Sequence, residues 1–349
     1  MALVRYRNQV LSLDSALSLT RGNPVGLMGA LSQLNPRRDS FTGVVPASDC
    51  DPKLIGQMCY TQGQRSARLS FMAPASAGGS PGIADLLDGL TCQAGDWGAF
   101  NLLAEADEHH PIFENLRRSN FFVYAWQRVW RFMPSAQREK GVSNRWKTAS
   151  PLDEIALRSL YQALVPPLVQ SAEPFIYHPH QGLVYRHTDA KHQYGDVLGY
   201  IESRHGPRGV YLQPVIHPDV EDTLGLLVDL IQALPVLYLG RPVYIAVRSY
   251  QSWLEAALEE LHGQVAPRQA LFVKHLASAQ RVLATNKRLV LEKHQAEPTA
   301  PMVNNLVFGF PEMTPGFGVV SGHTPAHNPK SGDIPWEIPS GNNYSKTKG

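Results

Sequence analysis

At 349 residues, the chain is long enough for two domains of ordinary size, each with its own hydrophobic core. Its composition, 43% hydrophobic and 18% charged residues, is typical of a globular protein and excludes a wholly disordered chain. A formal net charge of +2 gives no electrostatic argument for a nucleic acid or an acidic membrane surface, so we expect neither partner.

The cysteines and the apolar runs indicate the compartment. The three cysteines, Cys50, Cys59 and Cys92, cannot form a complete disulfide framework, so reduced thiols are the simplest interpretation. No segment approaches the ~20 apolar residues of a membrane span, and residues 1–7 lack the apolar run of a signal peptide. We therefore expect a cytoplasmic protein.

The first part of the chain, residues 1–133, alternates between strand and helix signals. Strands are predicted at 3–6, 41–45, 66–72, 99–104 and 121–132, helices at 83–90 and 110–118, and a short helix or loop at 52–60. Ser80 suits the N-cap of the helix at 83–90, and Pro81 suits its first position.

A polar, basic stretch at 134–150 predicts a linker, and a second domain is expected at 151–280. Its predicted strands are 197–201, 210–215, 243–247 and 270–273, and its predicted helices are 153–164, 220–234 and 252–262. The helix at 220–234 carries an apolar stripe at helical spacing, which predicts one buried face. In the last helix, Ser252 and Glu255 form a capping box and Gly263 allows a left-handed end.

The order strand, helix, strand, helix, strand occurs in both domains, so the chain contains the same unit twice. We call residues 1–133 the first copy and residues 151–280 the second copy. Prolines and glycines recur through residues 281–349, which predicts an extended or disordered tail. The apolar residues 306–310 of this tail suit docking on a folded surface.

This order of elements, preceded by helices and a small meander, resembles the GCN5-related N-acetyltransferase (GNAT) fold. Residues 113–121 and 253–263 carry the resemblance locally, and two copies in one chain resemble the tandem members of the superfamily. The resemblance implies a mixed-sheet α/β fold and acyl transfer from acetyl-CoA, or another acyl-CoA, to the amine of a small molecule or peptide. A homodimer is compatible with it.

In proteins of this fold, the strand before the long helix diverges from its neighbour and admits the pantetheine arm. The following turn then offers backbone amides to the pyrophosphate. In the first copy the matching positions are Met72, Ala73, Gly78, Gly79, Ser80 and Gly82. This turn is rich in glycine and free of acids, which favours a phosphate, although a flexible loop capped by Ser80 fits the same residues. The first copy is therefore the expected acyl-CoA site.

The turn of the second copy carries Asp219, Glu221 and Asp222. Three carboxylates suit a helix N-terminus but repel a pyrophosphate in the same place. We therefore expect the second copy to be unable to bind CoA in the usual manner.

A catalytic acid is not evident, because the helix that often carries a tyrosine in this fold has Ile112 and Phe113 in the first copy. Glu105 and His109, where the strand after the long helix ends, are the candidates for accepting a proton from an amine. A solvated turn between strand and helix is the alternative. Two functions therefore stay open: an acyl-CoA-dependent N-acyltransferase, and a non-catalytic binding or interaction protein of the same fold.

Two further residue groups stand out in the sequence. The four histidines at 178, 180, 187 and 192 match no closed zinc pattern, so we expect no metal. Trp126 and Trp130 lie four apart on a predicted strand and are expected in a core or between the copies.

Overall fold

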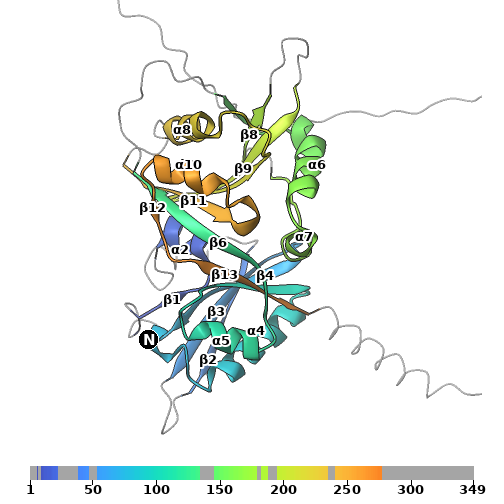
Figure 1. Ribbon diagram of the computed structural model, residues 1–349. Helices are drawn as coiled ribbons and strands as arrows, with labels where there is room; N and C mark the ends of the chain where they lie inside the picture. Colours follow the sequence, from blue (N-terminus) through green and yellow to red (C-terminus); the bar gives the residue numbers. More distant parts are fainter. Residues whose placement is uncertain are drawn as a thin grey trace, which may run out of the picture. The chain divides into compact units, whose positions relative to one another are not determined.

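The computed structural model describes residues 6, 9–22, 38–46, 53–133, 145–178, 182–187, 195–234 and 240–276. Within these ranges 13 strands form one mixed sheet with helices packed against it, which confirms the predicted α/β class (Figure 1). The predicted tail at 281–349 and most of the predicted linker lie outside the described residues.

The first copy contains the predicted strand–helix–strand–helix–strand unit. Its elements are β2 (Arg38–Val45), β3 (Leu54–Thr61), β4 (Ser66–Ala73), α4 (Ile83–Asp96), β5 (Asn101–Asp107), α5 (Ile112–Arg118) and β6 (Phe122–Phe132). The helix α4 buries Leu86 and Leu90 against β2 and β3. A Cβ at Gly56 would lie 3.0 Å from both leucine side chains, so glycine allows the close approach of helix and sheet.

The interpretation of residues 52–60 as a short helix or loop was wrong, because Leu54–Thr61 form the strand β3. This strand pairs with β2 on one side and with β4 on the other, and its first five residues are buried. A strand buried on both faces lacks the alternation of apolar and polar residues by which an isolated strand is recognised.

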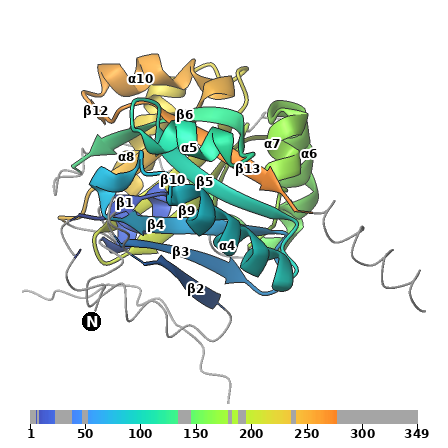
Figure 2. The same ribbon diagram turned by 90° about the horizontal axis from the view of Figure 1, so that it is seen from below.

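A segment at the start of the first copy lies against β4. It contains β1 (Leu11–Ser12) and α2 (Ser15–Arg21), and β1 pairs antiparallel with β4 (Figure 2). Asp14 begins α2, since its Oδ1 accepts a hydrogen bond from the Leu17 amide at 2.9 Å. The strand predicted at 3–6 lies outside the described residues except for Tyr6, which is in a turn.

The second copy repeats the unit. Its elements are β7 (Trp146–Thr148), α6 (Glu154–Leu164), α7 (Pro167–Ala172), β8 (Gly182–Arg186), β9 (Val197–Gly206), β10 (Gly209–Ile216), α8 (Thr223–Ala233), β11 (Val243–Arg248), α10 (Leu254–Glu260), β12 (Gln264–Val265) and β13 (Gln269–His275). Short 3₁₀ helices are η1 (Ala75–Ala77), η2 (Pro151–Asp153) and η3 (Ser249–Gln251). The predicted repeat of the unit is thereby confirmed.

The two copies share one sheet by exchanging their last strands. The strand order is β2-β3-β4-β5-β13-β6-β11-β10-β9-β8-β7, so β13 of the second copy lies between β5 and β6 of the first. The strand β6 in turn pairs with β11 of the second copy over Gln127–Phe132, and Figure 1 shows it passing both β13 and β11. The domain boundaries proposed from the sequence stay a prediction, and the sheet runs continuously across them.

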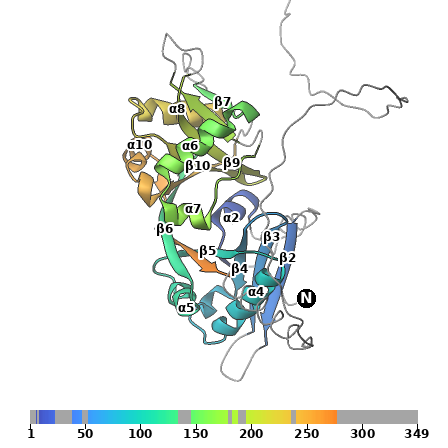
Figure 3. The ribbon, with the colours of Figure 1, turned by 90° about the vertical axis from the view of Figure 1, so that its right-hand side faces the viewer.

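The helices α6 and α7 cover the region where the copies meet (Figure 3). Leu157 and Val169 from these helices share a buried cluster with Leu103 of the first copy and Val215 of the second. Ser66 Oγ of β4 donates a hydrogen bond to the Ala172 carbonyl at the end of α7, at 3.1 Å. The second copy's helices therefore hold the first copy directly.

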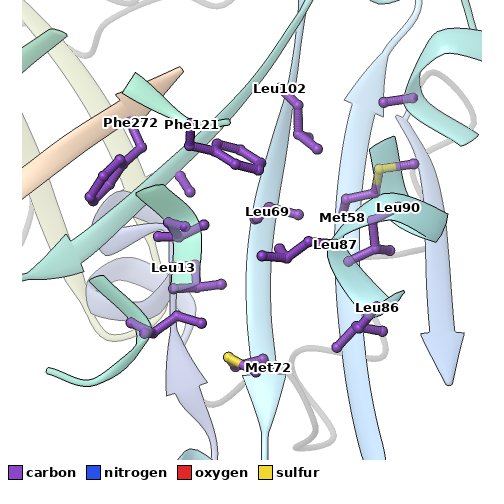
Figure 4. Close-up of a cluster of buried hydrophobic side chains, with 14 of the residues drawn as sticks. Leu13, Met58, Leu69, Met72, Leu86, Leu87, Leu90, Leu102, Phe121 and Phe272 are labelled. Atoms are coloured by element: carbon purple, nitrogen blue, oxygen red, sulfur yellow. The ribbon is translucent and has the colours of Figure 1, made fainter. Parts of the chain in front are cut away.

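The hydrophobic core of the first copy includes residues from three separate segments. This core includes Leu13, from the start of the copy, and Phe272, from β13, which lies beside Phe121 in Figure 4. Trp126 packs against this core, whereas Trp130 is 5% exposed in the core of the second copy. Both tryptophans were expected in a core or between the copies, and they contact different cores.

Three predicted helix ends were wrong. The helix α10 begins at Leu254 without a side-chain cap, because η3 leads into it and the Glu255 amide donates to the Ser252 carbonyl at 3.0 Å. Its left-handed residue is His262, with φ 57°, and not Gly263. A Cβ at Gly263 would lie 2.5 Å from the Phe132 ring, so that glycine serves packing.

At the third end, α4 begins at Ile83 with Gly82 as its N-cap residue and without a side-chain cap, so Ser80 is not the N-cap. The chain turns into α4 through successive backbone hydrogen bonds, among them Ile83 N to Ser80 O at 3.2 Å. Such a tight entry satisfies the first amides without a cap side chain.

Candidate functional site

The groove expected for acyl-CoA in the first copy lies between two parallel strands. The strands β4 and β5 pair only at Ser66, Ala67 and Arg68 with Asn101, Leu102 and Leu103, and then diverge. The strands β10 and β11 of the second copy likewise pair over three residues only, Val210, Tyr211 and Leu212 of β10. Both copies therefore have the diverging strands of the GNAT fold, and the predicted resemblance is confirmed at the level of the fold.

The gap between β4 and β5 is occupied by the chain itself. In β1, Leu11 pairs with Met72 and Ser12 with Phe71. The next residue, Leu13, spans the gap: its amide donates to the Ser70 carbonyl, and its carbonyl accepts from the Glu105 amide, both at 3.0 Å. We call residues 11–15 the N-terminal plug.

The plug is anchored by side chains as well as by its backbone. The Leu13 side chain is 3% exposed within the first core (Figure 4). Beyond it, the Ser15 amide donates to Glu105 Oε2 at 2.9 Å, and Ser15 Oγ donates to Gln269 Oε1 of β13 at 3.0 Å. Main-chain groups that a bound pantetheine arm would need are thus paired within the protein.

The predicted cofactor-binding residues lie around this gap. Met72 and Ala73 are buried at the end of β4, and Gly78, Gly79, Ser80 and Gly82 form the turn that leads into α4. Within the turn, the Gly78 amide donates to Ala75 O at 3.1 Å and the Ser80 amide to Ala77 O at 2.9 Å. These two amides are therefore already bonded, and the role of the turn in binding a phosphate stays a prediction.

The start of α5 covers one side of the same turn. Asn115 Nδ2 donates to the Gly78 carbonyl at 2.8 Å, and a Cβ at Gly78 would lie 2.6 Å from the His110 ring. Gly79 is less crowded, because its Cβ would meet only Pro111, at 3.6 Å. A side chain at position 79 therefore fits without displacing its neighbours.

The two predicted catalytic residues occupy different surroundings. Glu105 is 6% exposed and also accepts a hydrogen bond from Gln127 Nε2 at 3.1 Å. Burial and the nearby Asp14 carboxylate raise its pKa above the ordinary value, against the hydrogen bond from Ser15. The His109 side chain is 85% exposed and lies 3.4 Å from Glu108. The structure does not bring the two into one buried site, and their catalytic role stays a prediction.

In the second copy a carboxylate occupies the N-terminus of α8. Asp222 Oδ1 accepts from the Gly225 amide at 2.8 Å, and its Oδ2 lies 2.9 Å from Arg145 Nη1. The hydrogen bond from Gly225, together with Arg145, lowers the pKa of Asp222. The place where a pyrophosphate would bind therefore already holds an intramolecular anion.

A cavity of about 450 Å³ lies between the copies. It is lined from β3 and β4 of the first copy, from the segment after α7, and from β9 and β10 of the second. Its charged lining residues are Asp14, Arg65, Arg68, Glu173, Glu202 and Arg204. This cavity has no signature in the sequence, because its residues come from segments far apart in the chain.

Glu173 connects the two copies beside the cavity. Its carboxylate lies 2.8 Å from Arg68 Nη2 of β4 and 3.0 Å from Arg248 Nη2 of β11. Burial alone would raise the pKa of Glu173, but Arg248 and Arg68 outweigh it and lower the pKa to about 2. Arg248 is 2% exposed, and among the described residues nothing hydrogen-bonds to its Nε or Nη1. Loss of Glu173 would therefore remove the carboxylate that pairs with the buried Arg248.

The remaining predicted features are placed as follows. His178 lines the cavity, whereas His180 and His192 lie outside the described residues. No group of three or more potential ligands is placed to hold a metal among the described side chains. In the described part of the chain, no helix combines the length and the apolar character needed to span a bilayer. The cytoplasmic location and the homodimer stay predictions.

Solved structures similar to this chain include GNAT proteins. One is a GCN5-related N-acetyltransferase from Sphaerobacter thermophilus, with 13% identity and a TM-score of 0.44, matched over 77% of this chain and 96% of that one. Another, from Kribbella flavida, has 14% identity and a TM-score of 0.43, over 71% and 95%. A tandem GNAT protein from the clavulanic acid biosynthesis pathway has 16% identity and a TM-score of 0.40, over 71% and 86%.

No protein-family model and no curated protein matches the sequence. The fold therefore rests on this chain's own topology, namely the repeated order of elements and the two diverging parallel pairs.

Proposed function

We propose that this chain is a tandem protein of the GNAT fold that acts by binding, and that neither copy transfers an acyl group from CoA. The observation that carries the proposal is the N-terminal plug, which fills the gap between β4 and β5 with Leu13 bonded to both strands. The second copy supports the same conclusion, because Asp222 fills the anion position at α8.

Displacing the plug has a free-energy cost. Removing Leu13 from the core exposes a leucine side chain, which costs about 1.5–3 kcal/mol. It also breaks the backbone bonds of Leu13 to Ser70 and Glu105 and leaves those buried groups unpaired until a ligand replaces them. An acyl-CoA would have to offset these losses before it gained net affinity.

A second function, acyl-CoA-dependent N-acyltransfer to an amine, is favoured by one specific observation. The plug pairs with β4 at only two residues, and the turn behind it carries no acidic side chain between residues 75 and 82. Loss of so short a strand would open a groove that leads to a neutral turn. In this alternative acetyl-CoA or another acyl-CoA enters the first copy after the plug has left.

A thermal-shift titration with acetyl-CoA separates the two functions, because a ligand that binds only the native state raises the unfolding midpoint. We expect no shift with millimolar acetyl-CoA. A shift that disappears in Gly79→Asp would overturn the proposal and establish the first copy as the acyl-CoA site. The matched control is Gly89→Asp, which adds the same charge to α4 at a position whose Cβ has nothing within 4 Å.

A further inference from the structure

The cavity between the copies has a balanced set of charges. Its lining includes three arginines and three carboxylates, and the apolar side chains Leu103, Phe175 and Val215 complete the walls. A volume of about 450 Å³ falls within the range of small-molecule sites, roughly 300–1,000 Å³. The space therefore suits a small molecule more than an ordered water or two.

The charges fall into a fixed group and an adjustable group. Arg68 pairs with Glu173, and Glu173 is also held by the buried Arg248. Glu202 and Arg204 instead pair with each other along one strand at 3.1 Å, and their side chains are 32% and 40% exposed. An ion pair of this exposure is weak, so a ligand can separate its members at little cost.

Asp14 and Arg204 lie together at one end of the cavity, since both also line a neighbouring cavity of about 330 Å³. Asp14 is 4% exposed, and Oδ1 of its carboxylate is used in capping α2. A carboxylate and a guanidinium thus both line this end of the cavity, where Arg204 pairs with Glu202. Such a pair suits a ligand with both signs of charge.

We infer that this cavity binds a small dipolar molecule that carries one ammonium group and one carboxylate. Arg204 holds the ligand carboxylate, and Asp14 and Glu202 hold the ammonium group. A dianion would meet the lining carboxylates and a dication the arginines, and like charges in a partly buried site are costly. The inference rests on the proposed function in that the chain acts by binding, and it names the class of ligand.

The test uses three probes with the same five-carbon chain and different end groups: 5-aminopentanoate, glutarate and 1,5-diaminopentane. The α-amino acid L-norvaline, also of five carbons, provides a second spacing of the two charges. Binding to the full chain is measured by calorimetry and by the unfolding midpoint. We expect a dipolar probe to bind at millimolar concentration and the other two to bind at least about tenfold more weakly. Equal or tighter binding of glutarate or 1,5-diaminopentane, or no binding of either dipolar probe, would overturn the inference.

Variants localise the site. Arg204→Gln is expected to lower the affinity for the dipolar probe at least about tenfold, because it removes a charge-assisted hydrogen bond. The matched control is Arg128→Gln, which removes an arginine 47% exposed in a pair with Glu255, outside the cavity lining. If Arg204→Gln does not fold, Glu202→Gln tests the ammonium end in the same way. Unchanged affinity in a folded variant would overturn the inference.

Failure here is distinguishable from failure of the proposed function. An acetyl-CoA shift that Gly79→Asp abolishes would refute the proposed function, whether or not the dipolar probes bind. Absence of probe binding, with no acetyl-CoA shift, would refute only the dipolar ligand.

Discussion

The two copies are closed at two different positions of the fold and by different means. In the first copy a piece of main chain, the N-terminal plug, fills the gap between the diverging strands, and Leu13 bonds to both. In the second copy a side chain, the Asp222 carboxylate, occupies the N-terminus of the helix. The plug takes the place of the extended arm of an acyl-CoA, and the Asp222 carboxylate takes the place of its pyrophosphate.

This difference teaches that a fold can lose a ligand site without losing its strands or helices. A strand edge accepts any extended backbone, so the plug needs no special sequence beyond an apolar anchor. A helix N-terminus accepts any anion, so one aspartate suffices. The plug is buried and the aspartate is exposed, so removing them should have unequal effects on stability.

The largest effect is expected at Glu173, which joins both copies. Glu173→Gln leaves Arg248 buried with a neutral partner, and breaking a buried pair costs about 3–5 kcal/mol. Chemical denaturation of the wild type and of each variant measures the free energy of unfolding. The matched control is Glu255→Gln, in a pair with the half-exposed Arg128, where about 0–1 kcal/mol is expected. Equal costs in the two variants would show that Glu173 does not join the copies energetically.

Leu13→Ala tests the main-chain closure. It removes a side chain that is 3% exposed, and we expect a loss of about 3 kcal/mol in the free energy of unfolding. Leu19→Ala, at a half-buried position of α2, is the control and should cost clearly less. An acetyl-CoA shift in Leu13→Ala, absent from the wild type, would show that the plug excludes the cofactor from the first copy.

The pH dependence of the unfolding free energy tests the ion pairs that Glu173 makes with Arg68 and Arg248. The pKa of Glu173 falls from 4.5 to about 2 on folding, so its ionised form stabilises the protein fully above pH 4.5. That contribution, about 3 kcal/mol, is lost as the pH falls toward 2. The difference in unfolding free energy between wild type and Glu173→Gln should therefore narrow over this window. A difference that stays constant would contradict the assigned pKa.

The smallest effect is expected at the side-chain closure. Asp222→Ala removes the cap of α8 and one partner of Arg145, and the loss of a cap costs about 1 kcal/mol. Asp219→Ala, whose side chain is 77% exposed, should change stability by no more than about 0.5 kcal/mol. Thermal unfolding compares the stabilities of the two variants. If Asp222→Ala gained an acetyl-CoA shift, the anion position of the second copy would be usable after all.

Elements with strong local signals were predicted well. The apolar stripe at 220–234 became α8, although Leu226 and Leu230 are fully buried while Leu224 and Ile231 are half-buried at its edge. The run at 121–132 became β6 almost unchanged. Apolar periodicity reports which residues avoid water, and that preference acts whatever the neighbouring element is.

Features that depend on distant partners were not predicted. The strand β3 looked irregular because both its faces are buried, and the Ser252 cap is absent because η3 leads into α10. The exchange of β6 and β13 between the copies has no local signature, since either partner strand would satisfy the same apolar pattern.

The candidate site divides in the same way. The sequence by itself determined the repeated unit, the neutral turn of the first copy and the acidic turn of the second, because glycine, proline and carboxylates act on the backbone next to them. Only the tertiary structure decided that Leu13 fills the first gap and that Glu173 meets Arg68 and Arg248 beside a cavity. These contacts join residues separated by scores of positions in the chain, and pairing over such separations is fixed by the packing of the whole sheet.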